Sequence, residues 1–329
     1  MYLSLQAVRE RVRDSAKTSV RNGVSRLEFH AMASLCVVTF AAAPTLTKTF
    51  QQAVLEWVAD FEATYSRFIP ESLISQINAK AGREWIDIDS ETEHLLSLCQ
   101  EAFVFTRGVF EPTALPLIEL WNWKSQSPVI PTDAAIDVAK SKIGWSRVQR
   151  SPGKIFLPEG MSLDLGGIGK EYAVDKVAEL ASQHGIHDIL IDFGRDILAL
   201  GVPPHGAPAW HIGLDDPNQP GKCWVGLRAK DVAIATSGDY IRRFEVNGRR
   251  YGHIIDIRTG YPVANGLIAV SIIAPRCTVA GMLATTVFIL GPGEGVELLN
   301  MLPGVAGAIV TNRSRVTSRN FYEYIVSGG

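Results

Sequence analysis

Apolar residues recur at regular spacing along most of the chain, and this spacing predicts the first elements. The run 35–40 is rich in β-branched residues and predicts a strand. The apolar positions that follow have the spacing of one helix face and are Phe50, Val54, Val58 and Phe61. We expect this helix to pack its apolar stripe against a sheet.

The clearest helix signal comes next along the chain. Residues 85–88 alternate between apolar and polar side chains, which is typical of a strand. Ser90 and Glu93 have the spacing of a capping box, in which two side chains satisfy free N–H groups at a helix start. A helix is therefore expected to begin at Ser90 and to end at Gly108, because glycine readily adopts the backbone conformation that ends helices.

Two stretches suggest internal boundaries. We expect residues 1–28 to form a basic N-terminal arm and 29–329 to form the main domain. The apolar residues of the arm have helical spacing, which predicts an amphipathic helix on the body or on a partner; they are Leu5, Val8, Val12 and Ala16. The proline-rich stretch near 125–131 is a possible boundary between two lobes. Thr132 follows it and is expected to cap a short helix through Ala139.

The second half of the chain continues with a strand, turn, helix and strand unit. Residues 163–165 predict the end of a strand, and the glycines of 166–169 predict a tight turn. A helix is expected over 170–182, closed by Gly185, followed by a strand at 189–193.

The C-terminal elements complete the prediction of fold class. A buried helix is expected over 280–290, a second helix through Leu299, and strands at 306–310 and 321–325. Helices and strands alternate without regular βα repetition. The sequence therefore predicts an α+β, or mixed α/β, fold rather than a doubly wound sheet.

Composition narrows the class of protein. The chain has 329 residues, 47% of them hydrophobic, and a formal net charge of −2. A near-neutral chain argues against a protein that binds nucleic acid by broad phosphate neutralisation. The apolar run 279–290 is shorter than the ~20 residues that cross a bilayer, so no membrane span is expected.

The cysteines indicate a compartment. Their scattered positions match neither a zinc site nor a disulfide framework, and they are Cys36, Cys99, Cys223 and Cys277. We interpret them as buried, small apolar residues in a reducing compartment, and we expect a cytoplasmic protein.

Reactive residues are densest between 235 and 260. Gly238 and Gly260 allow backbone N–H groups to approach an anion closely. The neighbouring donors suit phosphate oxygens and are Thr236, Ser237, Arg258 and Thr259, while His253 can accept a proton near neutral pH. The alternative is a plain hairpin with its turn at 246–249, in which His253 is only hydrogen-bonded within the sheet.

Other segments have two interpretations each. The turn 166–170 places glycines and a lysine before a helix, as in a phosphate loop, but its spacing matches neither a Walker nor a Rossmann motif. Residues 194–196 could border a polar ligand or form an exposed turn with an ion pair. In 68–72 and 109–113, an aromatic residue beside an acid could stack on a base or belong to the core.

Taken in order, these segments resemble the ApbE family, the Mg-dependent FAD:protein FMN transferases. The match runs from about Met32 to about Gly293. The most specific agreements are Ala-Thr-Ser-Gly-Asp at 235–239 and the segment 253–262. Further agreements are at 32–34, 66–78, 108–113, 164–175 and 194–196.

The resemblance implies an ApbE-like two-lobed fold with a flavin cleft between the lobes. It also implies transfer of FMN from FAD to a Ser or Thr hydroxyl of a flavin-accepting target protein, with release of AMP. His253 matches the catalytic base, and Phe68 the residue that stacks on the adenine. The residues implied in flavin binding are Met32, Phe68, Ser72, Glu111, Thr113, Lys170, Asp175, Gly194, Arg195, Asp196, Thr236, Ser237, Gly238, Asp239, His253, Ile255, Arg258 and Thr259.

The implied Mg²⁺ site departs from the family pattern. The family carries an Asp and, four residues later, a Thr on one helix face. Thr285 matches the Thr, but Gly281 stands at the Asp position, which leaves Thr285 and the backbone carbonyl near Gly167 as expected ligands of a weakly bound ion. Further departures from the family are Ala33, Glu111, Glu171 and Arg195.

These departures leave two alternatives to the transferase. One is a flavin carrier or chaperone without the metal-dependent step. The other is a pyrophosphatase that hydrolyses FAD to FMN and AMP. Arg195 is a candidate to neutralise the pyrophosphate in place of the metal. The sequence predicts neither the identity of the acceptor protein nor the oligomeric state.

Overall fold

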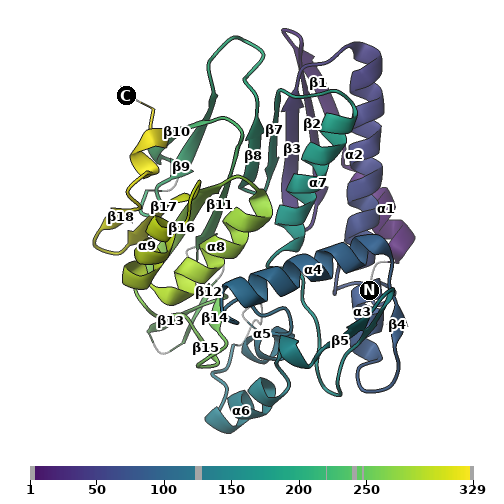
Figure 1. Ribbon diagram of the computed structural model, residues 1–329, viewed down its shortest axis with the longest axis vertical. Helices are drawn as coiled ribbons and strands as arrows, with labels where there is room; N and C mark the ends of the chain where they lie inside the picture. Colours follow the sequence, from purple (N-terminus) through teal and green to yellow (C-terminus); the bar gives the residue numbers. More distant parts are fainter. Residues whose placement is uncertain (1–3, 123–127, 220, 239–242, 247, 327–329) are drawn as a thin grey trace.

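The computed structural model describes residues 4–122, 128–219, 221–238, 243–246 and 248–326. Its central feature is a nine-stranded sheet in which every neighbouring pair is antiparallel (Figure 1). In spatial order, its strands are β1 (Lys17–Arg21), β2 (Val24–Ala31), β3 (Ser34–Phe40), β7 (Ile189–Phe193), β8 (Asp196–Leu200), β11 (Val232–Gly238), β16 (Leu267–Ala274), β17 (Ala306–Thr311) and β18 (Arg315–Thr317).

Helices cover one face of this sheet (Figure 1). They are α2 (Pro44–Tyr65), α7 (Gly169–Gln183), α8 (Cys277–Leu290) and α9 (Pro292–Met301). The stripe predicted on α2 is buried in the main core, with Phe50, Val54 and Val58 fully inaccessible and Phe61 nearly so. The helix forms where predicted because its apolar residues repeat at the helical period and find a sheet to cover.

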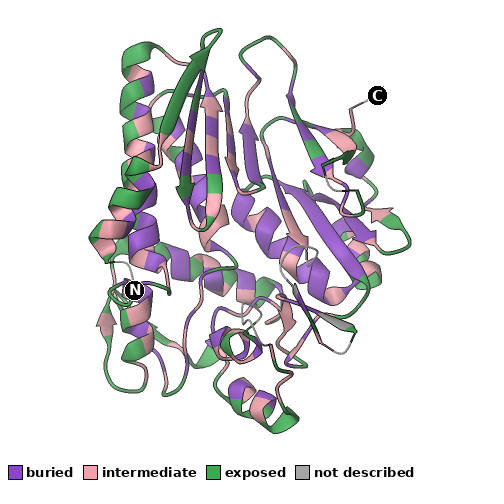
Figure 2. Ribbon diagram, turned by 180° about the vertical axis from the view of Figure 1, so that it is seen from behind, coloured by how far each residue is buried: buried purple, intermediate pink, exposed green. Residues whose placement is uncertain are grey.

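The opposite face of the sheet is covered only in part. The hairpin of β9 (Trp210–Asp215) and β10 (Cys223–Ala229), together with the short helix η2 (Phe321–Tyr324), packs over the middle strands in a second core. Figure 2 shows this face, with buried residues concentrated in the central strands and β1 exposed at one edge. The expected α+β class is therefore confirmed.

A smaller region lies beyond one end of the sheet, below it in Figure 1. Helix α4 (Ser90–Phe105) runs between the sheet and this region. The other elements are α3 (Leu73–Ala79), β4 (Ile86–Asp87), α5 (Leu115–Trp121), α6 (Asp133–Ser141), η1 (Trp145–Arg147), β5 (Gln149–Ser151), β6 (Lys154–Phe156), β12 (Arg243–Val246), β13 (Arg249–Gly252), β14 (Ile255–Asp256) and β15 (Tyr261–Pro262).

The N-terminal residues are joined to the body. Helix α1 (Leu5–Asp14) forms as predicted and lies on α2, with Val8 and Val12 buried. Arg9 pairs with Asp60 at 2.5 Å, and Arg11 pairs with Glu62 at 2.6 Å. The expected division after residue 28 falls inside β2, which the main sheet contains.

Several local predictions are confirmed and others are wrong. Thr132 caps α6, accepting a hydrogen bond from the Ala135 N–H at 3.3 Å. The cap of α4 is Asp89 rather than Ser90, because the Asp89 carboxylate accepts the Thr92 N–H at 2.8 Å. Residues 125–127 of the expected lobe boundary lie outside the described residues.

Two predicted strands are absent for identifiable reasons. Residues 163–165 are not a strand, because the Asn78 side chain takes both backbone hydrogen bonds of Leu163. Residues 321–325 are wrong as a strand as well. There, turn hydrogen bonds such as Glu323 N–H to Asn320 O at 3.2 Å wind the backbone into η2. Both segments contain apolar residues, but the distant Asn78 side chain at Leu163 and turn hydrogen bonds at 321–325 take backbone groups that a strand would pair.

Two expectations from composition can be compared with the structure. Cys36, Cys99 and Cys277 are buried as expected, but Cys223 on β10 is exposed. Throughout the described ranges, no helix combines the length and the apolar character needed to cross a membrane.

Candidate functional site

The turns at one end of the sheet bring several predicted segments together. The start of β3 pairs with the end of β7 through Cys36 and Phe193, and the Gly194 N–H donates to Leu35 O at 3.1 Å. Strand β11 pairs with β8 in the register Ile234 to Ile197, so its last residues extend past the start of β8. The β2–β3 turn, the β7–β8 turn and the end of β11 therefore share one edge.

The backbone of these turns adopts left-handed conformations. Gly194 has φ of 60°, and a Cβ there would lie 2.5 Å from the Ser34 hydroxyl, so this position requires glycine. Met32, Ala33 and Arg195 also have positive φ, at 51°, 56° and 78°. Such residues cost about 1 to 2 kcal/mol each and concentrate at functional sites.

Lys170 and Asp196 form the electrostatic centre of this edge. The Lys170 Nζ lies 2.5 Å from Asp196 Oδ2 and donates to Gly194 O at 3.2 Å. Burial opposes a charge on Lys170, but the nearby carboxylates of Asp196 and Glu171 outweigh it and raise the pKa of the lysine. Lys170 is therefore a fixed cation in the first turn of α7.

Glu171 is the functional candidate that our sequence reasoning missed. The residue is partly exposed overall, but its Oε2 atom is buried and has no hydrogen-bond partner in the described part of the chain. Burial raises the pKa of Glu171 to about 8, with Asp196 adding to the effect and Lys170 opposing it. The only sequence signal was an acid in place of the family's glycine after Lys170.

Asp175 has a role that the expected flavin contact did not include. Its two carboxylate oxygens accept the N–H groups of Cys277 and Thr278, at 2.8 and 3.0 Å, and the Thr278 hydroxyl at 2.7 Å. These N–H groups belong to the first turn of α8, which has no capping side chain of its own. Asp175 therefore caps α8 from α7.

The hydroxyls expected on β11 connect the sheet to α8. The Ser237 and Thr285 hydroxyls lie 3.0 Å apart, and those of Thr236 and Ser271 lie 2.8 Å apart. Gly238 ends β11 next to them, whereas Asp239 lies outside the described residues. The structure thus brings Ser237 and the expected metal ligand Thr285 into direct contact.

The His253 segment follows the predicted hairpin. Strands β12 and β13 pair as expected, and the partly buried His253 comes directly after β13. The Arg258 guanidinium binds both carboxylate oxygens of Asp256, and the Thr259 hydroxyl donates to Asp256 O at 3.2 Å. Ile255 pairs with Pro262 across β14 and β15.

Helices α5 and α6 hold the same segment in place. The Trp121 indole donates to Gly260 O at 2.7 Å, and Lys140 Nζ donates to Arg258 O at 2.7 Å. Gly260 has φ of 82°, and a Cβ there would overlap Ile136. Trp121 and Lys140 were not among the predicted residues, because they lie more than a hundred positions away in sequence.

Other predicted residues are used locally. Ser72 is buried and caps α3, and the Glu111 carboxylate accepts the Thr113 hydroxyl at 2.6 Å and the Trp145 N–H at 3.1 Å. The Arg195 guanidinium pairs with Asp215. None of these contacts by itself indicates a flavin.

Phe68 is connected to the glycine turn through its neighbour. Its side chain is 58% exposed, with the Arg67 guanidinium 4.3 Å from the ring centre. Arg67 also pairs with Asp164 at 3.2 Å, directly before the turn that leads to α7. The exposed ring is therefore held near that turn, in a position open to a flat ligand.

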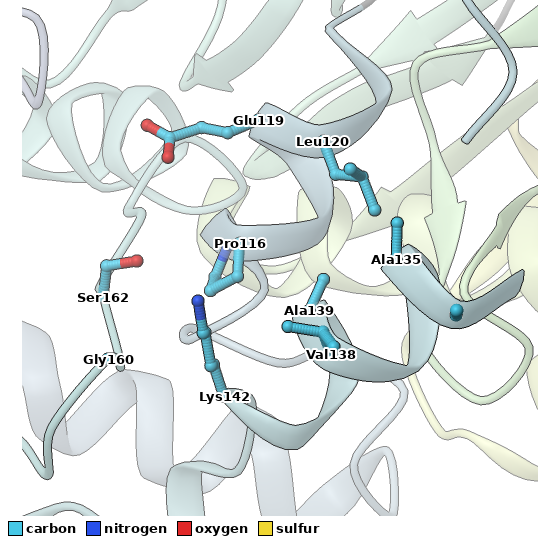
Figure 3. A pocket seen from close by; sticks show the side chains of 10 residues that line it. Pro116, Glu119, Leu120, Ala135, Val138, Ala139, Lys142, Gly160 and Ser162 are labelled. Atoms are coloured by element: carbon cyan, nitrogen blue, oxygen red, sulfur yellow. The ribbon is translucent and has the colours of Figure 1, made fainter. Parts of the chain in front are cut away.

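A groove of about 580 Å³ between α5 and α6 is a separate feature (Figure 3). Its lining is mainly apolar and includes Pro116, Leu120, Ala135, Val138 and Ala139. None of the predicted site residues that the structure describes lines it. The candidate site is therefore defined by polar contacts at the sheet edge and not by this groove.

The available metal donors are oxygen atoms. Within the described ranges, no cluster of three or more His, Cys, Asp or Glu side chains could hold a metal. Hydroxyl, carbonyl and single carboxylate oxygens remain, and these hard donors suit Mg²⁺ when a substrate phosphate completes the shell.

Comparisons with known proteins agree with this geometry. The model of the ApbE family matches residues 32–309. The chain is 33% identical to the FAD:protein FMN transferase of Treponema pallidum, over 75% of this chain and 72% of that protein. It is 30% identical to the enzyme of the same name from Vibrio cholerae, over 78% of each.

Solved structures give the same result. The ApbE protein of Thermotoga maritima aligns with a TM-score of 0.84 and 28% identity, over 94% of this chain and all of that one. The flavin transferase ApbE of Vibrio cholerae aligns with a TM-score of 0.81 and 23% identity, over 94% and 99% of the two chains. The family match, the sequence identities and the shared fold together establish that this chain belongs to the ApbE family.

Proposed function

We propose that the protein is an FAD:protein FMN transferase, which moves FMN from FAD to a Ser or Thr hydroxyl of a target protein and releases AMP. The observation that carries the proposal is the cationic Lys170 held at the strained β7–β8 turn, at the same end of the sheet as the Ser237–Thr285 contact. The names of the curated relatives support the same reaction.

The diphosphate of FAD would bind along this edge. Lys170 supplies a partly buried positive charge, and the amide groups near Gly194 and Gly238 can approach anionic oxygens. Arg258 can add a guanidinium contact, because its side chain is half exposed although paired with Asp256. Preorganised charges of this kind stabilise the charge that develops during phosphoryl transfer.

The transfer exchanges one phosphorus–oxygen bond for another. The acceptor hydroxyl oxygen forms a bond to the phosphorus of the FMN half, and the bond from that phosphorus to the AMP oxygen breaks. His253 would take the hydroxyl proton as general base. The segment that carries it is held by Trp121 and Lys140, which favours a defined position.

The remaining flavin contacts are proposed from the family pattern. Phe68 is exposed and suited to stacking. The rest of the proposed set is Met32, Ser72, Glu111, Thr113, Asp175, Arg195, Asp196, Thr236, Ser237, Asp239, Ile255 and Thr259. Asp175, Ser72 and Glu111 already make hydrogen bonds within the protein. We therefore propose that they support the backbone around the site.

Mg²⁺ is proposed at the same edge. The Thr285 hydroxyl and the backbone carbonyl of Gly167 are oxygen donors that fit it. When bound there, the ion neutralises charge on the pyrophosphate. We further propose that the reaction takes place in the cytoplasm, a location that the four free cysteines support.

The test is a transfer assay with an acceptor protein of the Vibrio cholerae relative. Incubation with FAD and Mg²⁺ should release AMP and give a fluorescent acceptor band. His253→Ala should lower the rate at least about a hundredfold, since general bases contribute this much. His211→Ala is the control, because His211 is exposed on β9.

Other outcomes would identify other functions. Bound FAD without AMP would indicate a carrier, and AMP with free FMN would indicate a hydrolase. Full activity in His253→Ala would refute the proposed base.

A further inference from the structure

We propose that Glu171 is the metal-binding carboxylate of this site and occupies the space that Gly281 leaves free. The inference rests on the proposed function, because it concerns the ion that would hold the pyrophosphate. It goes beyond that function by assigning a ligand on α7, whereas the family pattern has its carboxylate on the helix that here is α8.

The first argument is that Glu171 is the incompletely satisfied acid of the site. Three carboxylates lie in or beside the first half of α7. Asp175 has both oxygens bound to α8, and Asp196 is paired with Lys170. Glu171 Oε2, in contrast, is buried and has no hydrogen-bond partner among the described residues. A buried acid without a partner is costly, so it indicates a missing ligand.

The second argument is the fit between Glu171 and Gly281. A Cβ at Gly281 would lie 2.5 Å from Glu171 Cγ, 2.7 Å from Oε1 and 2.9 Å from Cδ. These contacts are shorter than real Cβ atoms make. The glycine therefore makes room for the carboxylate, and any side chain at 281 would have to displace it. In this chain the carboxylate therefore comes from α7, but it fills the space beside position 281 of α8, where the family pattern has its Asp.

The third argument is the register of the two helices. Asp175 contacts Cys277, and Glu171 packs on Gly281. Between these two contacts the residue on α7 moves back by four positions while the residue on α8 moves forward by four, so α7 and α8 run antiparallel. Four residues before Glu171 is Gly167, and four residues after Gly281 is Thr285. On α8, Thr285 lies one turn after Gly281 on the same face, so it is one turn from the place where Glu171 packs. On α7, Glu171 lies toward the end that leads to the Gly167 turn.

These three residues make a chemically consistent set. A carboxylate, a hydroxyl and a backbone carbonyl are hard oxygen donors, and Mg²⁺ in phosphate-transferring sites commonly uses one or two carboxylates plus substrate oxygens. Lys170, the residue before Glu171, faces Asp196 instead.

The experiment measures metal binding directly. Free Mn²⁺ is followed by electron paramagnetic resonance as it is added to the full-length protein, with FAD absent and present. Glu171→Gln keeps the shape and removes the charge, so we expect at least about tenfold weaker Mn²⁺ binding. Glu179→Gln on the exposed side of α7 is the matched control and should bind Mn²⁺ like the wild type.

A reciprocal exchange tests the location. Gly281→Asp alone should lower Tm, because its Cβ overlaps Glu171. Glu171→Gly alone should lose Mn²⁺ affinity. The double variant Glu171→Gly with Gly281→Asp should regain it, since the acid returns to the same space from α8.

The outcomes separate this inference from the proposed function. Wild-type Mn²⁺ affinity in a folded Glu171→Gln protein that still transfers FMN would overturn the role of Glu171 and leave the transferase intact. Absence of FAD binding by the wild type with Mg²⁺ present, measured by flavin fluorescence, would overturn the transferase itself. Absence of Mn²⁺ binding by the wild type in the presence of FAD would also overturn the metal site.

Discussion

At the scale of single residues, burial decides the chemistry of the cysteines. Burial raises the pKa of Cys36 and of Cys99 to about 12, and that of Cys277 well above its ordinary value. Cys223 is exposed instead, because β10 belongs to a two-stranded sheet outside the main core. In the sequence Cys223 follows Gly221 and Lys222, a polar signal that the interpretation of all four cysteines as buried did not use.

This difference predicts one reactive thiol. The thiolate is the reactive form, so at pH 8 a thiol of pKa near 12 is ionised to about one part in ten thousand. The native protein should therefore react with Ellman's reagent at Cys223 alone between pH 7 and 9. Cys223→Ser should abolish the fast reaction, and denaturant should reveal the other three thiols. Fast labelling of two or more thiols in the native state would contradict the assignment.

At the scale of elements, helices are fixed to one another through their ends. Helix α8 is strongly apolar and lacks a capping side chain of its own, so Asp175 on α7 satisfies its first N–H groups. The His253 segment is held in the same manner by Trp121 and Lys140. Each case joins residues more than a hundred positions apart in sequence.

Removal of the Asp175 carboxylate should destabilise the fold. Asp175→Ala leaves two buried N–H groups and a buried hydroxyl without their acceptor, so we expect a loss of about 2 to 4 kcal/mol in the free energy of unfolding. Urea denaturation at pH 7 measures this loss. Asp137→Ala on exposed α6 should change it by less than about 0.5 kcal/mol. Unchanged stability with lost FAD binding would instead indicate direct contact with the flavin.

At the scale of the whole molecule, the N-terminal residues belong to the folded unit. Helix α1 buries Val8 and Val12 against α2, and β1 and β2 extend the main sheet. The basic character of this stretch suggested an arm, but Arg9 and Arg11 pair with Asp60 and Glu62 of α2. The ion pairs at this surface orient the helix, while the two valines supply most of the stabilisation.

Deletion of residues 1–15 should therefore lower Tm. Loss of two buried valines removes about 3 to 6 kcal/mol of apolar burial, so the truncated protein should unfold several degrees earlier in calorimetry. Its metal-free affinity for FAD at temperatures well below Tm should stay unchanged, because no proposed contact lies in the deleted stretch. Val20→Ala on exposed β1 is the control and should leave Tm unaltered. A truncated protein with wild-type Tm would show that α1 does not contribute to the fold.

The amino-acid sequence by itself determined the main helices, a minority of the strands and the resemblance to the family. Helical spacing at Phe50, Val54 and Val58, and the cap at Thr132, depend on residues a few positions apart, and such local patterns can be read along the chain. The order of the motifs between Met32 and Gly293 carried the resemblance to the family. Where prediction failed, as at 163–165, a side chain from elsewhere supplied the hydrogen bonds.

Only the tertiary structure decided how the site is assembled. In sequence, Glu171 and Gly281 are two separate departures from a family pattern, and the glycine suggested a lost ligand. The antiparallel packing of α7 and α8 brings the two together, so that the acid fills the space beside the glycine. That relation depends on the relative position of two helices, which is set by the packing of the whole core and not by any local stretch of the chain.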